Sequence, residues 1–167
     1  GTDSVTLSPY LGFESLRPAL DAATTNQRGT FVLALTSNPE GKSVQHVGKA
    51  EDTGAVAKQV IAAATAENTA QTWERMGSCG LVVGATVGEA LKELAIDLST
   101  FNGPILSPGY GAQGASAEDL YRIFAGVESQ VLVNSSRGVL SAGPQPADLA
   151  RAAQSARDDL VRARGTS

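Results

Sequence analysis

The stretch Pro104-Ile105-Leu106-Ser107-Pro108-Gly109-Tyr110-Gly111-Ala112-Gln113-Gly114-Ala115 is a short apolar run that ends abruptly in a glycine-rich loop. Three glycines of that loop surround one amide side chain, Gln113. Because glycine has no Cβ, it allows backbone N–H groups to approach a ligand closely. The pattern is typical of a strand that presents its loop to an anion, and a surface turn that needs glycine dihedrals has the same composition.

A second apolar run, Gln130-Val131-Leu132-Val133-Asn134-Ser135-Ser136-Arg137-Gly138-Val139-Leu140, ends in the same way downstream. It places Arg137 directly after a strand, and the planar guanidinium of arginine suits phosphate. Taken alone, Arg137 is better explained as an exposed arginine after a strand. In a parallel α/β barrel, however, the loops after the last two strands are the usual place for a phosphate site. The two runs together predict a phosphate grip at adjacent strand ends.

Strands and helices alternate five times along the chain. The expected strands are 3–8, 30–36, 79–86, 104–107 and 130–134, and the expected helices are 14–25, 54–75, 87–95, 117–124 and 146–164. The strand at 30–36 is apolar throughout, as expected when helices cover both faces. We expect Ser116 to cap the helix at 117–124. This order predicts a parallel α/β chain, either an open doubly wound sheet or part of a closed barrel.

The composition fits one soluble domain of 167 residues with enough chain to bury a core. The net charge of −4 is spread over interspersed acidic and basic residues, which argues against a nucleic-acid surface and a membrane-binding face. A single cysteine, Cys79, indicates a reducing cytoplasm. No stretch reaches transmembrane length. The Gly1-Thr2 start and the Gly165-Thr166-Ser167 end lead us to expect a chain cut from something longer.

Other chemically capable residues are better explained by packing or solvation. Cys79 begins a strand and has no histidine near it in sequence, so we interpret it as a packing residue. Trp73, near the end of the long helix, is interpreted as a packing anchor. Asp158 and Asp159 are interpreted as a solvated helix face. His46 has no partner at metal-ligand spacing, so no metal site is expected.

Five motifs, in this order and at these spacings, resemble orotidine 5′-phosphate decarboxylase, specifically the longer bacterial type found in mycobacteria and related actinobacteria. The resemblance extends over essentially the whole chain from Asp3. The motifs are Ser8-Pro9-Tyr10-Leu11-Gly12-Phe13, Leu35-Thr36-Ser37-Asn38-Pro39-Glu40-Gly41, Val82-Val83-Gly84-Ala85-Thr86, Pro108-Gly109-Tyr110-Gly111-Ala112-Gln113-Gly114 and Asn134-Ser135-Ser136-Arg137-Gly138.

The resemblance implies a TIM (β/α)8 barrel that works as a homodimer without a cofactor, of which the five strands here match the fourth to eighth. It also implies an OMP- or UMP-type nucleotide ligand. Ser37 would hydrogen-bond the pyrimidine, and Pro108 would lie in the loop lining the ring. Gln113 would reach over both phosphate and pyrimidine, and Arg137 would pair with the 5′-phosphate. Backbone N–H groups near Gly109 and Ser136 complete the implied substrate-binding set.

The family's catalytic Asp-x-Lys-x-x-Asp segment is missing from this sequence. The lysines present, Lys42, Lys49, Lys58 and Lys92, lie in an expected loop or on expected helices rather than at a strand end. We therefore expect no catalytic residue in this chain, which matches a C-terminal fragment or one chain of a split enzyme, completed by an N-terminal fragment. The alternatives are a non-catalytic phosphate- or nucleotide-binding module and a protein-interaction domain.

Overall fold

The computed structural model describes residues 1–48, 54–111 and 113–164. Five parallel strands form one sheet in chain order: β1 (Ser4–Leu7), β2 (Gly29–Leu35), β3 (Cys79–Val83), β4 (Ile105–Pro108) and β5 (Val131–Asn134). A doubly wound sheet reverses its strand order partway, whereas a barrel wall does not. The strand order therefore indicates part of a closed barrel rather than an open doubly wound sheet. Among residues discussed from the sequence, Lys49, Ala112 and residues 165–167 lie outside the described ranges.

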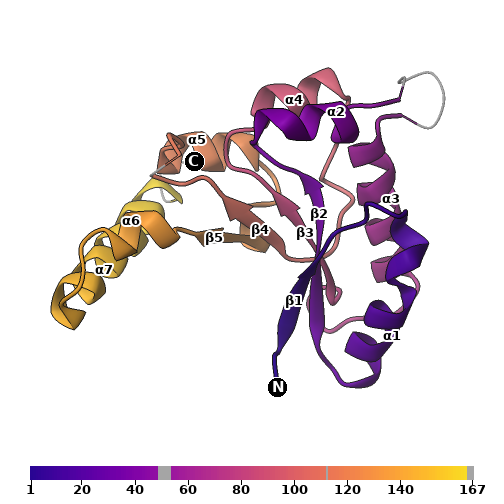
Figure 1. The fold of residues 1–167 in the computed structure, drawn as a ribbon, viewed down its shortest axis with the longest axis horizontal. Helices are drawn as coiled ribbons and strands as arrows, with labels where there is room; N and C mark the ends of the chain where they lie inside the picture. Colours follow the sequence, from indigo (N-terminus) through magenta and orange to yellow (C-terminus); the bar gives the residue numbers. More distant parts are fainter. Residues whose placement is uncertain (49–53, 112, 165–167) are drawn as a thin grey trace.

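Helices follow every strand and lie along one side of the curved sheet, while the last two extend beyond β5 as an arm (Figure 1). No helix in the described ranges is long and apolar enough to cross a bilayer. The helices are α1 (Arg17–Thr25), α2 (Lys42–Gln45), α3 (Val56–Thr69), α4 (Gly88–Glu93), α5 (Ala117–Ile123), α6 (Ser136–Leu140) and α7 (Pro146–Arg164), with 3-10 turns at Phe13–Leu16, Pro39–Gly41 and Glu128–Gln130.

The core lies between the sheet and this helical layer. Val32, Leu81 and Ile105 are paired across β2, β3 and β4 and are fully inaccessible to solvent. Phe101 and Phe124 join them as the largest buried side chains. Burying an aliphatic or aromatic side chain of this size stabilises a fold by about 1.5–3 kcal/mol. This face of the sheet therefore holds the chain together.

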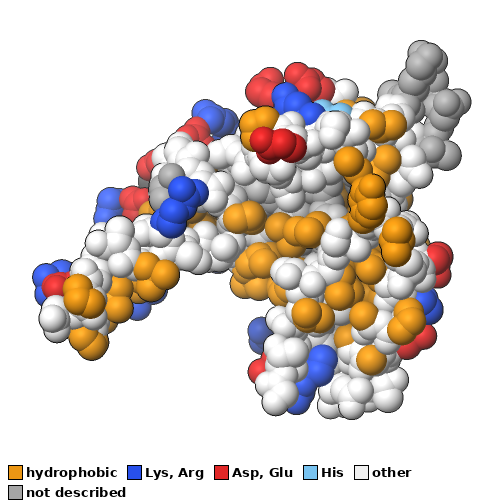
Figure 2. Space-filling model, in the orientation of Figure 1, with side chains coloured by type: hydrophobic (Ala, Val, Ile, Leu, Met, Phe, Trp, Pro, Cys, Tyr) orange, Lys and Arg blue, Asp and Glu red, His pale blue; other side chains and the backbone are white. Residues whose placement is uncertain are grey.

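The opposite face carries a second apolar row, Leu33–Val82–Leu106–Leu132, aligned by the strand register. Leu33 and Leu106 are half-buried and Leu132 is 50% exposed. Figure 2 shows hydrophobic side chains gathered in the hollow between β1 and the α6–α7 arm. The expectation that β2 is covered on both faces is therefore wrong: its residues alternate between buried and half-buried because no described element covers this side.

The elements differ from expectation at two places that matter. The helix expected at 54–75 ends at Thr69, and Trp73 lies in the turn that follows, where its indole N–H donates to the Asn68 carbonyl at 2.8 Å. The short helix α6 was not expected, and it carries Arg137. The predicted cap is confirmed, since Ser116 forms a reciprocal capping box with Asp119 at the start of α5.

Candidate functional site

Three neighbouring loops at the carboxyl edge of the sheet carry the residues predicted from the sequence. Ser37 follows β2, Pro108 ends β4 and opens the glycine loop, and β5 leads into α6 with Ser136 and Arg137. Because all strands are parallel, their carboxyl ends meet at one edge of the sheet. Pro108 and Asn134 are direct partners in the β4–β5 ladder, which places the last two loops side by side.

A small cavity of about 90 Å³ lies between the loops after β4 and β5. Among the residues that the structure describes, Arg137 is the only cationic side chain that lines it, and none of these lining residues is a carboxylate. Arg137 is exposed, and no carboxylate within the described ranges lies at ion-pair distance from it. A free guanidinium beside amide and hydroxyl groups is suited to an anion with several oxygens. The lining residues are Pro108, Gly109, Tyr110, Gln113, Asn134, Ser135, Ser136 and Arg137.

Ser37 joins this group through Gln113. Its hydroxyl donates a hydrogen bond to Gln113 Oε1 at 3.3 Å, which links the loop after β2 to the loop after β4. Five of the six predicted substrate-binding residues line the cavity and the sixth contacts one of them, so tertiary structure brings the whole predicted set together.

The glycine loop needs its glycines for conformation. Gly109 has φ 114, in the left-handed region that side chains disfavour, and a Cβ there would lie 3.6 Å from Ala85 and 3.7 Å from Gln113 Oε1. The base of the loop closes on itself, since Gly111 N–H donates to the Ala115 carbonyl at 2.9 Å and Ala115 N–H donates to the Gly109 carbonyl at 3.3 Å. These two hydrogen bonds therefore fix the backbone conformation at the base of the loop.

Sequence reasoning missed one partner of this loop. The phenol of Tyr110 donates a hydrogen bond to Asp159 Oδ2 on α7 at 2.7 Å. Burial raises the pKa of Tyr110 to about 12, and the neighbouring Asp159 carboxylate adds to that shift. Asp158 pairs with Arg157 at the surface, as expected for a solvated helix face. The Asp159 side chain is 43% exposed, but it also accepts the Tyr110 hydrogen bond, a contact that the sequence analysis did not predict.

Asn134 and Ser135 also line the cavity without having been singled out as site residues. Their position directly after a strand is a usable signal, because the carboxyl ends of barrel strands carry the site. No comparable signal marks Asp159, which lies on an amphipathic helix 49 residues after Tyr110.

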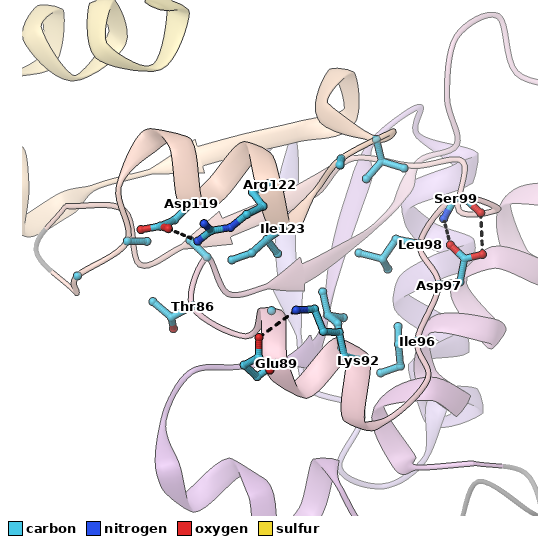
Figure 3. Close-up of a pocket in the computed structure, with 17 residues that line it drawn as sticks. Thr86, Glu89, Lys92, Ile96, Asp97, Leu98, Ser99, Asp119, Arg122 and Ile123 are labelled. Carbon is cyan, nitrogen blue, oxygen red and sulfur yellow. Dashed lines mark hydrogen bonds and ion pairs between the residues drawn. The ribbon is translucent and has the colours of Figure 1, made fainter. Parts of the chain in front are cut away.

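A larger hollow of about 510 Å³ lies between α4 and α5 on the helical side. Figure 3 shows its charged side chains turned toward partners that are close to them in sequence. Lys92 pairs with Glu89 at 3.1 Å, and Arg122 pairs with Asp119. Asp97 accepts hydrogen bonds from the backbone and hydroxyl of Ser99. These local pairs occupy the charges, so the hollow is a weaker candidate than the smaller cavity.

Neither the lysines nor the metal-binding side chains of the described residues contribute to the small cavity at this edge of the sheet. Lys42, Lys58 and Lys92 lie on α2, α3 and α4, and none lines the small cavity. Within residues 1–48, 54–111 and 113–164, no three His, Cys, Asp or Glu side chains are grouped to hold a metal ion. The edge as described can bind and orient an anion.

The sequential parallel strands, with helices on one face and polar loops at the carboxyl edge, define this chain as part of a parallel α/β barrel protein. The chain belongs to the orotidine 5′-phosphate decarboxylase / HUMPS family, whose family model matches residues 1–153.

Relatives with the same name are close in sequence and in structure. The chain is 47% identical over 156 residues to orotidine 5′-phosphate decarboxylase of Streptomyces coelicolor, covering 91% of this chain and 52% of that protein. It is 48% identical over 151 residues to the Salinispora arenicola protein of that name, and the match covers 90% of this chain and 52% of that protein. A crystal structure from Streptomyces avermitilis assigned to the same activity superposes with a TM-score of 0.87 at 46% identity, covering 98% of this chain and 55% of that one. The chain thus spans about half the length of the relatives that it matches.

Proposed function

We propose that this chain is the substrate-binding part of an orotidine 5′-phosphate decarboxylase, a carboxy-lyase that converts OMP to UMP and CO2 in pyrimidine biosynthesis in the cytoplasm. The observation that carries the proposal is the contact of Ser37 with Gln113 beside the cavity that Arg137 lines. The relatives at 47% and 48% identity bear this name, which supports the same assignment.

Each residue of the set has a role in holding the nucleotide. Arg137 pairs with the 5′-phosphate, assisted by backbone N–H groups next to Gly109 and Ser136. Gln113 lies between this phosphate position and Ser37, whose hydroxyl is suited to the polar edge of the pyrimidine. Pro108 offers an apolar surface to the pyrimidine ring.

Phosphate binding at this edge contributes to catalysis although it is remote from the reacting carbon. Decarboxylation at C6 passes through a vinyl carbanion that no cofactor delocalises, so the site must be closed and dry. Enzymes use the binding energy of non-reacting groups to stabilise such closed states. Arg137 and Gln113 supply that energy here.

The lysine and aspartates that act on the carbanion come from a segment outside this sequence. A closed eight-stranded barrel requires three parallel strands beyond the five described here. The apolar row Leu33–Val82–Leu106–Leu132 and the unpaired edges of β1 and β5 are suited to such a complement. We infer that an N-terminal half-barrel covers this face, and that the completed barrel works as a homodimer.

The test is OMP decarboxylation by this chain alone and after mixing with the part of the Streptomyces coelicolor relative that the chain does not match. Activity only in the mixture supports a binding half. Activity of the chain alone contradicts the assignment of the chemistry to another segment. UMP binding without activity in the mixture indicates a non-catalytic nucleotide-binding module, and absence of UMP binding in both samples overturns the proposal.

A further inference from the structure

Tyr110 ties the glycine loop to three neighbouring parts of the protein. The hydroxyl of Ser135 donates to the Tyr110 carbonyl at 3.4 Å, and a backbone bridge joins Tyr110 to Ala115. The Tyr110 phenol reaches outward to Asp159 of α7 at 2.7 Å. Tyr110 is therefore held by the β5 loop, by the base of its own loop and by the last helix.

We propose that the Tyr110–Asp159 hydrogen bond holds the glycine loop in its phosphate-binding position, which makes Tyr110 and Asp159 positioning residues. The inference rests on the proposed function, because it concerns the same phosphate. Neither side chain needs to contact the nucleotide. Tyr110 adjoins Gly109, and the loop continues through Gly111 to Gln113, so the position of Tyr110 sets where these groups lie around the cavity.

The loop gains from an external anchor because of its own composition. Gly109, Gly111 and Gly114 all have positive φ, and glycine loses more conformational freedom on ordering than any other residue. If the loop becomes ordered only when the ligand binds, the loss of conformational entropy opposes binding and lowers the affinity. An anchor next to Gly109 removes part of this loss before binding.

Helix α7 is a suitable anchor because it is itself packed. Its Ala163 is buried and its Leu160 is partly buried against the core, and α7 contacts α5. Asp159 immediately precedes Leu160, so its carboxylate is carried by the packed part of the helix. A carboxylate is a stronger acceptor than a neutral oxygen. The raised pKa of Tyr110 is in agreement with a phenol that stays protonated as the donor.

A merely structural role would link α7 to the sheet without influencing the loop. The two roles differ in which ligands they affect. UMP and uridine differ only in the phosphate, whereas Gln113 of the loop is proposed to reach both phosphate and pyrimidine. An effect on loop position therefore reduces UMP affinity by a larger factor than uridine affinity. A purely structural effect lowers the stability of the chain and weakens both ligands together.

The test compares Tyr110→Phe, Asp159→Ala and the double variant, with Asp158→Ala as matched control. Asp158 is the adjacent carboxylate on α7 and pairs with Arg157 at 2.7 Å. Binding of UMP, uridine and inorganic phosphate is measured by calorimetry on the full chain, alone and with the complementing part of the Streptomyces coelicolor relative. We expect each single variant to lose about fivefold to tenfold in UMP affinity, which corresponds to the net contribution of one ordinary intramolecular hydrogen bond. Phosphate affinity should fall in parallel, and the double variant should be no weaker than either single variant.

The control variant should bind UMP as the unmodified chain does, and Asp159→Asn, which keeps an acceptor oxygen, should recover most of the lost affinity. Equal weakening of UMP and uridine, or unchanged UMP affinity in both single variants, overturns the positioning role while leaving the proposed function intact. If the unmodified chain binds UMP no better than uridine both alone and with the complementing fragment, the proposed function and this inference both fail.

Discussion

The Ser37 hydroxyl and the Gln113 amide oxygen are joined by a hydrogen bond of 3.3 Å between loops that are 76 residues apart in sequence. One loop follows β2 and the other follows β4, so the bond crosses the end of β3. It connects the side chain proposed for the pyrimidine with the side chain proposed to span pyrimidine and phosphate. In the proposed complex, the groups that bind the two ends of the nucleotide contact each other.

We expect Ser37→Ala and Gln113→Ala each to weaken UMP binding by about 1 kcal/mol, or roughly fivefold, because each removes a polar contact to the ligand. The double variant should lose less than the sum, since the residues contact each other. Calorimetric titration of the four proteins measures this coupling. Ser43→Ala is the control, because Ser43 lies nearby on α2 and donates to the Glu40 carbonyl instead. Strict additivity would contradict a shared role.

Arg137→Ala should lower kcat/KM of the complemented enzyme. The loss of transition-state binding should be on the order of 2–5 kcal/mol, as for loss of one partner of a charged pair. Arg137→Lys should recover only part, because an ammonium lacks the planar fork. Steady-state kinetics with OMP measure the effect. Arg151→Ala is the control, since Arg151 pairs with Asp148 on α7. An Arg137→Ala enzyme with unchanged kcat/KM would rule out the phosphate contact.

Leu132→Gln should make the isolated chain less prone to self-association, because Leu132 is 50% exposed in the apolar row of the open face. The same change should weaken complementation by the half-barrel that buries this row. Sedimentation velocity and the fragment concentration needed for half-maximal activity measure the two effects. Val161→Gln serves as control, being 65% exposed on α7. Unchanged complementation would place the partner elsewhere.

Asn68→Ala should destabilise the fold by about 2–4 kcal/mol, because it leaves buried backbone groups without partners. The Asn68 amide donates to the Cys79 carbonyl at 2.8 Å and accepts from the Cys79 N–H at 3.1 Å, which fixes the start of β3. Urea unfolding measures the loss. Asn26→Ala, at an exposed helix end, removes one amide bond to the Ala22 carbonyl and should cost far less. Similar losses of unfolding free energy in both variants would contradict a stabilising role for the two Asn68–Cys79 hydrogen bonds.

Burial raises the pKa of the Cys79 thiol from 9.0 to about 11. The unfolded chain therefore releases this proton at lower pH than the folded chain, and folding stability should decline as pH rises from 9 toward 11. Unfolding free energies of the chain and of Cys79→Ala, measured at intervals between about pH 8 and pH 10, test the slope. The variant should show the shallower decline. Parallel slopes would mean that the thiol titrates normally.

Much of the fold follows from local sequence pattern. The apolar runs that form β2 to β5 are bounded by glycine, proline and polar residues, and each was located within a few residues. The capping of α5 by Ser116 was also predictable, because a capping box depends on residues three positions apart. Helix α3 was predicted to extend to residue 75, but it ends at Thr69. This end depends on the buried contacts of Asn68 with β3, which a local sequence pattern does not reveal.

The site was predictable to the extent that its residues lie at strand ends or in recognisable motifs. Gly109, Gln113 and Arg137 belong to short local patterns, and the parallel order of the strands brings these patterns to one edge. The contact of Asp159 with Tyr110 was missed because Asp159 has the same sequence surroundings on α7 as its neighbour Asp158. Only the direction in which α7 packs distinguishes the two carboxylates.

The sequence by itself determined the parallel α/β class, the loops that carry polar groups and the missing Asp-x-Lys-x-x-Asp segment, because each depends on residues that are neighbours along the chain. Tertiary structure alone decided the sequential strand order, the open apolar face around Leu132, and the contacts of Ser37 with Gln113 and of Tyr110 with Asp159. These features join residues far apart in sequence, and their partners are selected by how helices and strands pack rather than by local propensity.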